Sequence, residues 1–364
     1  MRRLLKSALC ATLFAATSCA YAQSIVTLYG SVDNLFDVSN QGKGTVAKLT
    51  SGGTFGSRWG LAGTEDLGGG YKAIFKLENG FSSTTGVIGQ GGALFGRTSW
   101  MGLQGPQGTL TFGRQYAPEF LAVAEYDAFN ASLGGSYFNI DRTLANGVVK
   151  STLMTDVVTG RTNDSIVYAS PSIYGLTTSL MYGLGGVPGS LSQGSTVSIG
   201  VNYHAGPLGL HSGYIRLKDA TDPGSYVEWG IGGTYVIGPT KLYAGYTKDI
   251  YSDTNTPTAA GSAVRYGLLN IGLKYQVTSP LTLILQVTKI INTSTGLPAS
   301  QNAYDESVEL SYQLSVRTNV YGAYSQVNNK NGSTYSLGGA VYYGSAALPN
   351  AMARSVQVGI RTVF

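Results

Sequence analysis

The sequence ends with Ser355-Val356-Gln357-Val358-Gly359-Ile360-Arg361-Thr362-Val363-Phe364, a stretch in which apolar and polar residues alternate. Because successive side chains of a strand point to opposite faces, Val356, Val358, Ile360 and Phe364 share one face, and Ser355, Gln357, Gly359 and Arg361 share the other. Chain termini fray unless something holds them. A closed membrane barrel holds its last strand, which pairs with the first so that no backbone edge faces lipid. The stretch therefore predicts an outer-membrane β-barrel, with Phe364 at the position where the barrel closes.

The first 22 residues have the features of an export signal. Basic residues precede an apolar run, and Ala20-Tyr21-Ala22 forms an A-x-A cleavage site. We expect a signal peptide over 1–22 and one transmembrane β-barrel domain over 23–364. A lipoprotein anchored at Cys19 is a weaker alternative, because Ala16 stands where a larger aliphatic residue is normally required.

The composition excludes several classes of protein. Cleavage removes three of 24 basic residues and none of the 19 acidic ones, so the net charge falls from +5 to +2. This small charge argues against general binding of nucleic acid. No run of 18 apolar residues predicts a transmembrane helix. The 51 Gly, the 25 Tyr and the 12% charged residues are typical of a membrane barrel, whereas a secreted β-solenoid would need a short repeat that we do not find.

Segments with a period of two recur along the whole mature chain and predict a 16-stranded antiparallel transmembrane β-barrel. The connections between them alternate between short turns and long loops, as in bacterial outer-membrane barrels, where the short turns are periplasmic. The predicted strands are 24–38, 54–67, 70–82, 93–105, 107–116, 162–171, 173–184, 195–205, 207–218, 226–237, 240–250, 264–277, 280–292, 303–314, 316–328 and 354–364. The predicted long loops are 39–53, 83–92, 117–161, 185–194, 219–225, 251–263, 293–302 and 329–353.

The alternation also predicts which face is wet. In 307–312, Val308, Leu310 and Tyr312 oppose Ser307, Glu309 and Ser311. Apolar residues outside and polar residues inside imply lipid around the barrel and water within it. The abundant tyrosines are expected as girdles at the two membrane interfaces.

Several motifs resemble the trimeric general porins of Gram-negative outer membranes, in their β-proteobacterial form. The resemblance covers the whole mature chain, although Val316 stands where a basic residue is common and the segment 117–161 is unusually long. It implies a water-filled barrel, assembled as a homotrimer, whose third loop folds into the pore. The motifs are Val26-Thr27-Leu28-Tyr29-Gly30, Ser57-Arg58-Trp59-Gly60-Leu61, Gly63-Thr64-Glu65-Asp66-Leu67-Gly68-Gly69-Gly70, Phe112-Gly113-Arg114-Gln115, Asn163-Asp164-Ser165-Ile166-Val167-Tyr168, Leu314-Ser315-Val316-Arg317-Thr318 and Val358-Gly359-Ile360-Arg361 before Phe364.

The resemblance implies that the third loop, 117–161, narrows the pore; an outward-facing loop is the alternative. Structureless loops of this length are uncommon unless functional or disordered. Its acidic residues are Glu119, Glu125, Asp127 and Asp141.

Basic residues on the facing strands are the candidates for the opposite wall of the constriction. Rings of Arg and Lys favour anions, and acids opposite them would create a transverse field. The candidates are Arg58, Arg97, Arg161, Arg114 and Lys76, although Arg114 has the parity of the apolar Leu110 and Phe112. For each arginine, a rim salt bridge or a contact with lipopolysaccharide is the alternative.

We therefore expect a passive diffusion channel for small hydrophilic solutes, with a preference for anions. A substrate-selective channel is the main alternative.

An enzyme is not expected, because the histidines, His204 and His211, lie far in sequence from any nucleophile, and no hydrolase or metal motif is present. An anchor would have a filled lumen, for which sixteen strands are too many, and nothing precedes the first strand that could plug an energy-coupled transporter. No cofactor is expected; the expected partners are other copies of the chain, lipopolysaccharide, phospholipid, the transported solutes and the outer-membrane assembly machinery.

Overall fold

The computed structural model describes residues 24–139, 160–220, 224–252, 263–294, 301–338 and 346–364. The predicted signal peptide and Asp141 lie outside these residues. The elements are β1 (Ile25–Asn40), β2 (Thr45–Ser51), β3 (Arg58–Gly68), β4 (Tyr71–Gly80), the 3-10 helix η1 (Gln90–Gly92), β5 (Thr98–Gly105), β6 (Gly108–Tyr116), α2 (Pro118–Ala124), β7 (Arg161–Ala169), β8 (Leu176–Gly183), β9 (Thr196–Ala205), β10 (Leu208–Lys218), β11 (Ser225–Ile237), β12 (Thr240–Ser252), β13 (Ala263–Thr278), β14 (Leu281–Asn292), β15 (Ala303–Gln313), β16 (Thr318–Asn329) and β17 (Met352–Val363).

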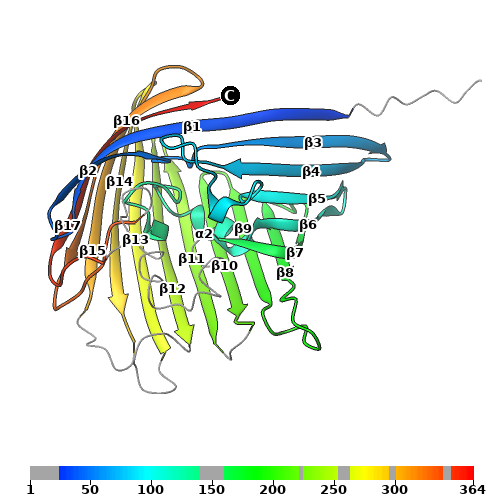
Figure 1. The fold of residues 1–364 in the computed structure, drawn as a ribbon. Coiled ribbons are helices and arrows are strands. Elements are labelled where there is room, and N and C mark those ends of the chain that lie inside the picture. The colour runs from blue at the N-terminus through cyan, green and yellow to red at the C-terminus, as the bar shows by residue number, and fades with distance from the viewer. Residues whose placement is uncertain (1–23, 140–159, 221–223, 253–262, 295–300, 339–345) are drawn as a thin grey trace, which may run out of the picture.

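The strands form one closed antiparallel barrel (Figure 1). Each strand from β3 to β17 pairs with the next, and β17 returns to β1. Residues 25–31 of β1 pair with β3, and residues 34–40 pair with β2. Because β2 and β3 together take one position beside β1, the described part of the chain forms a barrel of sixteen strands, as predicted.

Side chains alternate across the barrel wall as the sequence predicted. In β17, Val358 is 60% exposed and Gln357 is 0% exposed, although Gln357 is the polar residue. The same inversion holds in β15, where Leu310 is exposed and Glu309 is buried. Apolar residues thus point outward and polar residues inward, which confirms the predicted lipid-facing and water-facing sides.

Three predicted loops contain regular structure, one of them only the 3-10 helix η1 in the loop 83–92. The predicted loop 39–53 is wrong in part, because Thr45–Ser51 forms β2, a hairpin with β1. Only after this hairpin does the chain turn, through residues 52–57, to begin β3 at Arg58 rather than at residue 54. The third loop begins with α2, which has a proline at its first position, where a missing N–H costs nothing. The other strands start and end within a few residues of the prediction, except that β5 begins at Thr98, later than the predicted 93.

The described part of the third loop, 117–139, lies against the polar face of the barrel wall. The backbone N–H of Glu119 donates to Ser198 of β9 at 3.0 Å, and the backbone N–H of Ala128 donates to Gln286 of β14 at 2.8 Å. The side chain of Asn270, on β13, donates to the carbonyl of Tyr126 at 2.8 Å. Figure 1 shows α2 within the ring of strands. No helix among the described residues is long and apolar enough to cross a membrane.

Candidate functional site

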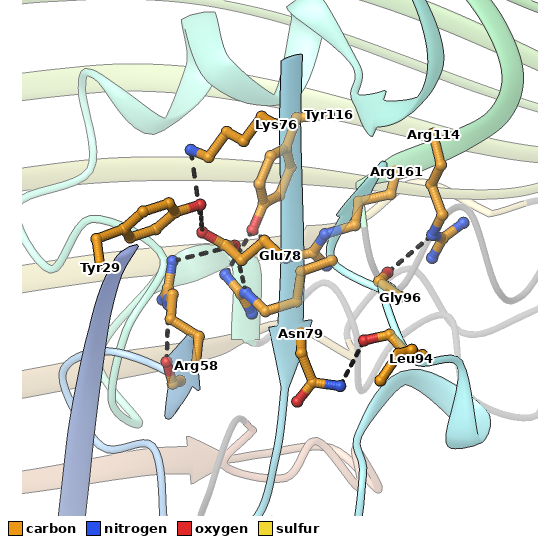
Figure 2. A network of polar contacts seen from close by, with 12 residues as sticks. Tyr29, Arg58, Lys76, Glu78, Asn79, Leu94, Gly96, Arg114, Tyr116 and Arg161 are labelled. Atoms are coloured by element: carbon orange, nitrogen blue, oxygen red, sulfur yellow. Dashed lines mark hydrogen bonds and ion pairs between the residues drawn. The ribbon is translucent and has the colours of Figure 1, made fainter. Parts of the chain in front are cut away.

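A single buried carboxylate, Glu78 on β4, gathers basic side chains from three strands or their flanks (Figure 2). Arg97 Nε lies 2.7 Å from Glu78 Oε1, within a charge-assisted hydrogen bond. Arg58 Nη1 and Lys76 Nζ each lie 3.9 Å from a Glu78 oxygen. The hydroxyl of Tyr29 donates to Glu78 Oε2 at 2.9 Å. The sequence predicted the three basic residues of this group and placed Tyr29 in a motif, but it did not single out Glu78.

Strand register explains how these residues meet. Gly60 of β3 is paired with Tyr29 on one side and with Glu78 on the other. A Cβ on Gly60 would lie 2.7 Å from the Tyr29 hydroxyl oxygen, so only glycine lets the tyrosine cross to its acceptor. Arg58 lies two residues away on β3, and Lys76 two residues away on β4, which places both on the same inward face.

Tyr116 extends the cluster to a third arginine. Arg97 Nη2 donates to the Tyr116 hydroxyl at 3.0 Å, and Arg161 donates to the same oxygen. The Arg161 guanidinium carbon also lies 4.0 Å from the centre of the Tyr116 ring, a cation–π contact. Arg58, Arg97 and Arg161 thus form one connected group, which we call the arginine cluster together with Lys76, Glu78 and Tyr116.

Among the described residues, the four cations of the arginine cluster share the single carboxylate of Glu78, so positive charge is in excess there. Arg97 and Arg161 are 7% and 5% exposed, so they are fixed within the cluster. The side chains of Arg58 and Lys76 are 17% and 38% exposed and carry the charge toward water. A wall of this kind attracts anions.

Arg114 lies apart from the arginine cluster. Its Nε donates to the carbonyl of Gly96 at 2.8 Å, and Nη1 donates to Asn163 at 2.7 Å. Its neighbours Leu110 and Phe112 are exposed on the outer side, and the register of β6 against β7 shifts between Gly113 and Gln115.

The predicted acidic residues of the third loop have different surroundings. Glu119 is 3% exposed, and its Cγ lies 3.0 Å from the place that a Cβ on Gly213 of β10 would take, so it faces the wall. Asp127 is 1% exposed and accepts from Gln286 Nε2 at 2.8 Å, from Ser136 Oγ at 2.5 Å and from the N–H of Ala131 at 2.8 Å. Burial raises the pKa of Asp127 above its ordinary value, and these hydrogen bonds oppose that rise.

Glu125 differs from both of these acids because its side chain is exposed. No ion pair joins an arginine of the cluster to Glu119, Glu125 or Asp127 in the part of the chain that the structure describes. The carboxylate within the arginine cluster comes instead from the barrel wall. Glu78 could have been identified from the sequence, because it lies two residues after Lys76 on one strand and therefore shares a face with it.

Three glycines of the barrel wall, Gly230, Gly232 and Gly245, leave room for the side chain of Tyr126 in the third loop. A Cβ on Gly232 would lie 2.3 Å from the ring of Tyr126, and a Cβ on Gly245 would lie 2.1 Å from it. A Cβ on Gly230 would lie 2.1 Å from the Tyr126 hydroxyl oxygen. The hydroxyl also hydrogen-bonds Thr247 at 2.9 Å. These glycines lie on the inward faces of β11 and β12, and no pattern noted in the sequence indicates that they belong together.

The two histidines lie next to each other. The ring centres of His204 and His211 are 5.2 Å apart, and His211 Nδ1 is hydrogen-bonded to Asn202 at 2.8 Å. Among the described residues, no three His, Cys, Asp or Glu side chains are placed to hold a metal ion.

Known proteins resemble this chain over nearly its full length. A sequence model described as Gram-negative porin matches residues 7–332. Outer membrane porin protein 32 of Delftia acidovorans is 30% identical over 385 residues, covering 99% of each chain. An outer membrane porin protein of Bordetella pertussis is 28% identical over 416 residues, covering 99% of this chain and all of the relative. The solved anion-selective porin from Comamonas acidovorans has a TM-score of 0.81 at 27% identity, covering 94% of this chain and all of that one.

Proposed function

The chain belongs to the Gram-negative porin family, and on this premise we propose that it conducts small hydrophilic solutes and ions passively across the outer membrane. The observation that supports this proposal is the arrangement of side chains on the barrel wall, where polar residues point inward and apolar residues point outward. Such a wall encloses water. Flux then follows solute gradients and needs no coupling to energy.

We infer that residues 117–161 narrow the pore and that the arginine cluster forms the opposite wall. The contacts of residues 117–139 with β9, β13 and β14 support this inference. Arg58 and Lys76 supply exposed positive charge, whereas Glu119 and Asp127 are turned into the wall. The four cations of the arginine cluster outnumber its own carboxylate and the exposed Glu125, so the resulting field favours anions. The relative from Comamonas acidovorans is itself described as anion-selective.

We also infer a homotrimer in the outer membrane. The porin family supports this assembly, and one solved outer membrane protein of Vibrio cholerae, with a TM-score of 0.68 at 15% identity, has been described in a trimer form. Lipopolysaccharide, phospholipid and the outer-membrane assembly machinery are the other expected partners. Catalysis is not proposed, since the family consists of channels and the histidines contact Asn202 and each other rather than a nucleophile.

The reversal potential of purified protein in a planar bilayer under a KCl gradient tests this function. Stepwise conductance with an anion-selective reversal potential is expected. Stepwise conductance with a cation-selective reversal potential would preserve the channel and refute the positive constriction. Absence of conductance from correctly folded protein would refute the channel itself.

A further inference from the structure

A row of side chains crosses four strands at the end of the barrel that carries the short turns. Strand register pairs Lys241 of β12 with Lys274 of β13, Lys274 with Ile284 of β14, and Ile284 with Glu309 of β15. Their neighbours along the strands, such as Leu242 and Leu310, are exposed on the outside. The row therefore lies on the inward face, near the turn at Gly238 and Pro239 that joins β11 to β12.

Two like charges stand directly opposite each other in this row. Side chains paired in this way have Cβ atoms about 4.5–5.5 Å apart, and like charges there repel. Lys241 Nζ lies 5.0 Å and Lys274 Nζ 5.7 Å from the centre of the same ring, that of Tyr243. Within the described residues, no carboxylate lies at ion-pair distance from either ammonium group. The acids nearest to Lys274, namely Asp127, Glu309 and Glu125, act on it from beyond ion-pair distance, so within this part of the chain neither ammonium group has a carboxylate in direct contact.

The two lysines line a cavity of about 420 Å³. Thr282, Ser311 and Glu309 line it as well. Ser311 Oγ accepts a hydrogen bond from Asn319 at 3.1 Å, which leaves its own hydroxyl hydrogen to be donated. Glu309, the acid of the row, is separated from Lys274 by Ile284. The cavity thus combines two ammonium groups and a hydroxyl donor with an acid at the far end of the row.

We propose that this cavity binds a compact oxyanion that carries two negative charges, with inorganic phosphate as the simplest member of the class. A dianion can accept from both ammonium groups at once and relieve their repulsion, whereas a monoanion neutralises only one. The acid at Glu309 limits the site to small anions, because a longer polyanion would extend toward it. The site is separate from the arginine cluster, and its role as a station along the pore rests on the proposed channel function.

Binding of inorganic phosphate to the folded full-length protein in detergent tests the site, followed by the ³¹P NMR linewidth at a pH where the dianion predominates. The variant Lys241→Gln/Lys274→Gln is expected to bind phosphate about tenfold more weakly, or about 1.4 kcal/mol. The matched control, Lys72→Gln/Arg317→Gln, removes the same charge from the same end of the barrel. There, Lys72 has Asp66 as its cross-strand neighbour, and Arg317 lies in the turn before β16.

Unchanged affinity in the control, together with recovery in Lys241→Arg/Lys274→Arg, would support the site. Equally weakened phosphate binding in both glutamine variants would show that only the net positive charge of this end of the barrel matters, which would overturn the proposed site. Absence of phosphate binding by the wild type would overturn it as well. Conductance of the same preparation in a bilayer is a separate measurement, so a failure of the channel function is distinguished from a failure of the site.

Discussion

The ring of Tyr126 occupies the space that a side chain on Gly245 would need: a Cβ there would lie 2.1 Å from Tyr126 Cδ2. Tyr126 is fully buried and belongs to the third loop, whereas Gly245 belongs to β12. The position of the loop against the wall therefore depends on the absence of one methyl group from a strand far away in the sequence.

Gly245→Ala is expected to loosen the loop. Overpacking of this kind costs about 1–3 kcal/mol, so hydrogen exchange in residues 117–139 should become about tenfold faster or more. Mass spectrometry of the exchanged peptides measures this rate. The control is Gly322→Ala, because a Cβ on Gly322 meets nothing nearer than 3.9 Å. Equal exchange in both variants would contradict the contact.

Neutralisation of Arg58 and Arg97 together is expected to lower the preference for anions. At about 8 Å from a passing ion in water, each charge contributes about 0.5 kcal/mol, with opposite sign for anions and cations. Because salt at about 0.1 M screens roughly half of this energy, loss of both charges should reduce the anion-to-cation permeability ratio about fivefold. The reversal potential measures this ratio. Arg114→Gln serves as the control, since Arg114 is bonded to Gly96 and Asn163 outside the arginine cluster. An unchanged ratio in the double variant would remove both arginines from the constriction.

Attachment of the third loop is expected to depend on pH through Asp127. Burial raises the pKa of this carboxyl in the folded protein, so the folded state holds the proton more tightly than the unfolded state. The stabilisation that this proton gives to the folded state is complete below the ordinary pKa of an aspartic acid, about 3.9. It is lost as the pH rises through the raised pKa of Asp127. Hydrogen exchange in residues 126–139 should therefore slow on acidification by more than its intrinsic pH dependence, and Asp127→Asn should abolish this excess. An excess that persists in Asp127→Asn would assign it to another group.

Removal of Phe364 is expected to impair closure of the barrel. Its N–H and carbonyl exchange two backbone hydrogen bonds of 3.0 Å with Gly30, each worth about 1 kcal/mol. Its ring lies 2.2 Å from where a Cβ on Gly30 would be. The yield of heat-resistant oligomer on gels should fall for the deletion and be retained in Phe364→Tyr. A normal yield from the deletion would limit Phe364 to a girdle at the membrane interface.

The barrel could be predicted from the sequence because strand alternation is a local signal that reports directly on lipid and water. β2 escaped prediction because a short strand follows the turn at Gly42 and Gly44, and its seven residues were absorbed into a loop. α2 escaped because its seven residues lie within a segment that was treated as one connector.

The candidate site was only partly predictable. The basic residues were identified from their type and parity, and Arg58, Lys76, Arg97 and Arg161 do meet. Glu78, the carboxylate that contacts them, lies on the wall and was not singled out from the sequence. The match of Tyr126 to its glycines could not be inferred, since it depends on how two segments more than a hundred residues apart approach each other.

The pairing of β1 with β17 sets an order of events as well as a shape. Neighbouring hairpins close over short stretches of chain, whereas this seam joins residues from opposite ends of the sequence, and contacts of such high separation form slowly. Until the seam forms, the sheet has two open edges, and each can accept a strand from another molecule. Intramolecular pairing of β1 with β17 therefore competes with aggregation, and a high protein concentration favours aggregation.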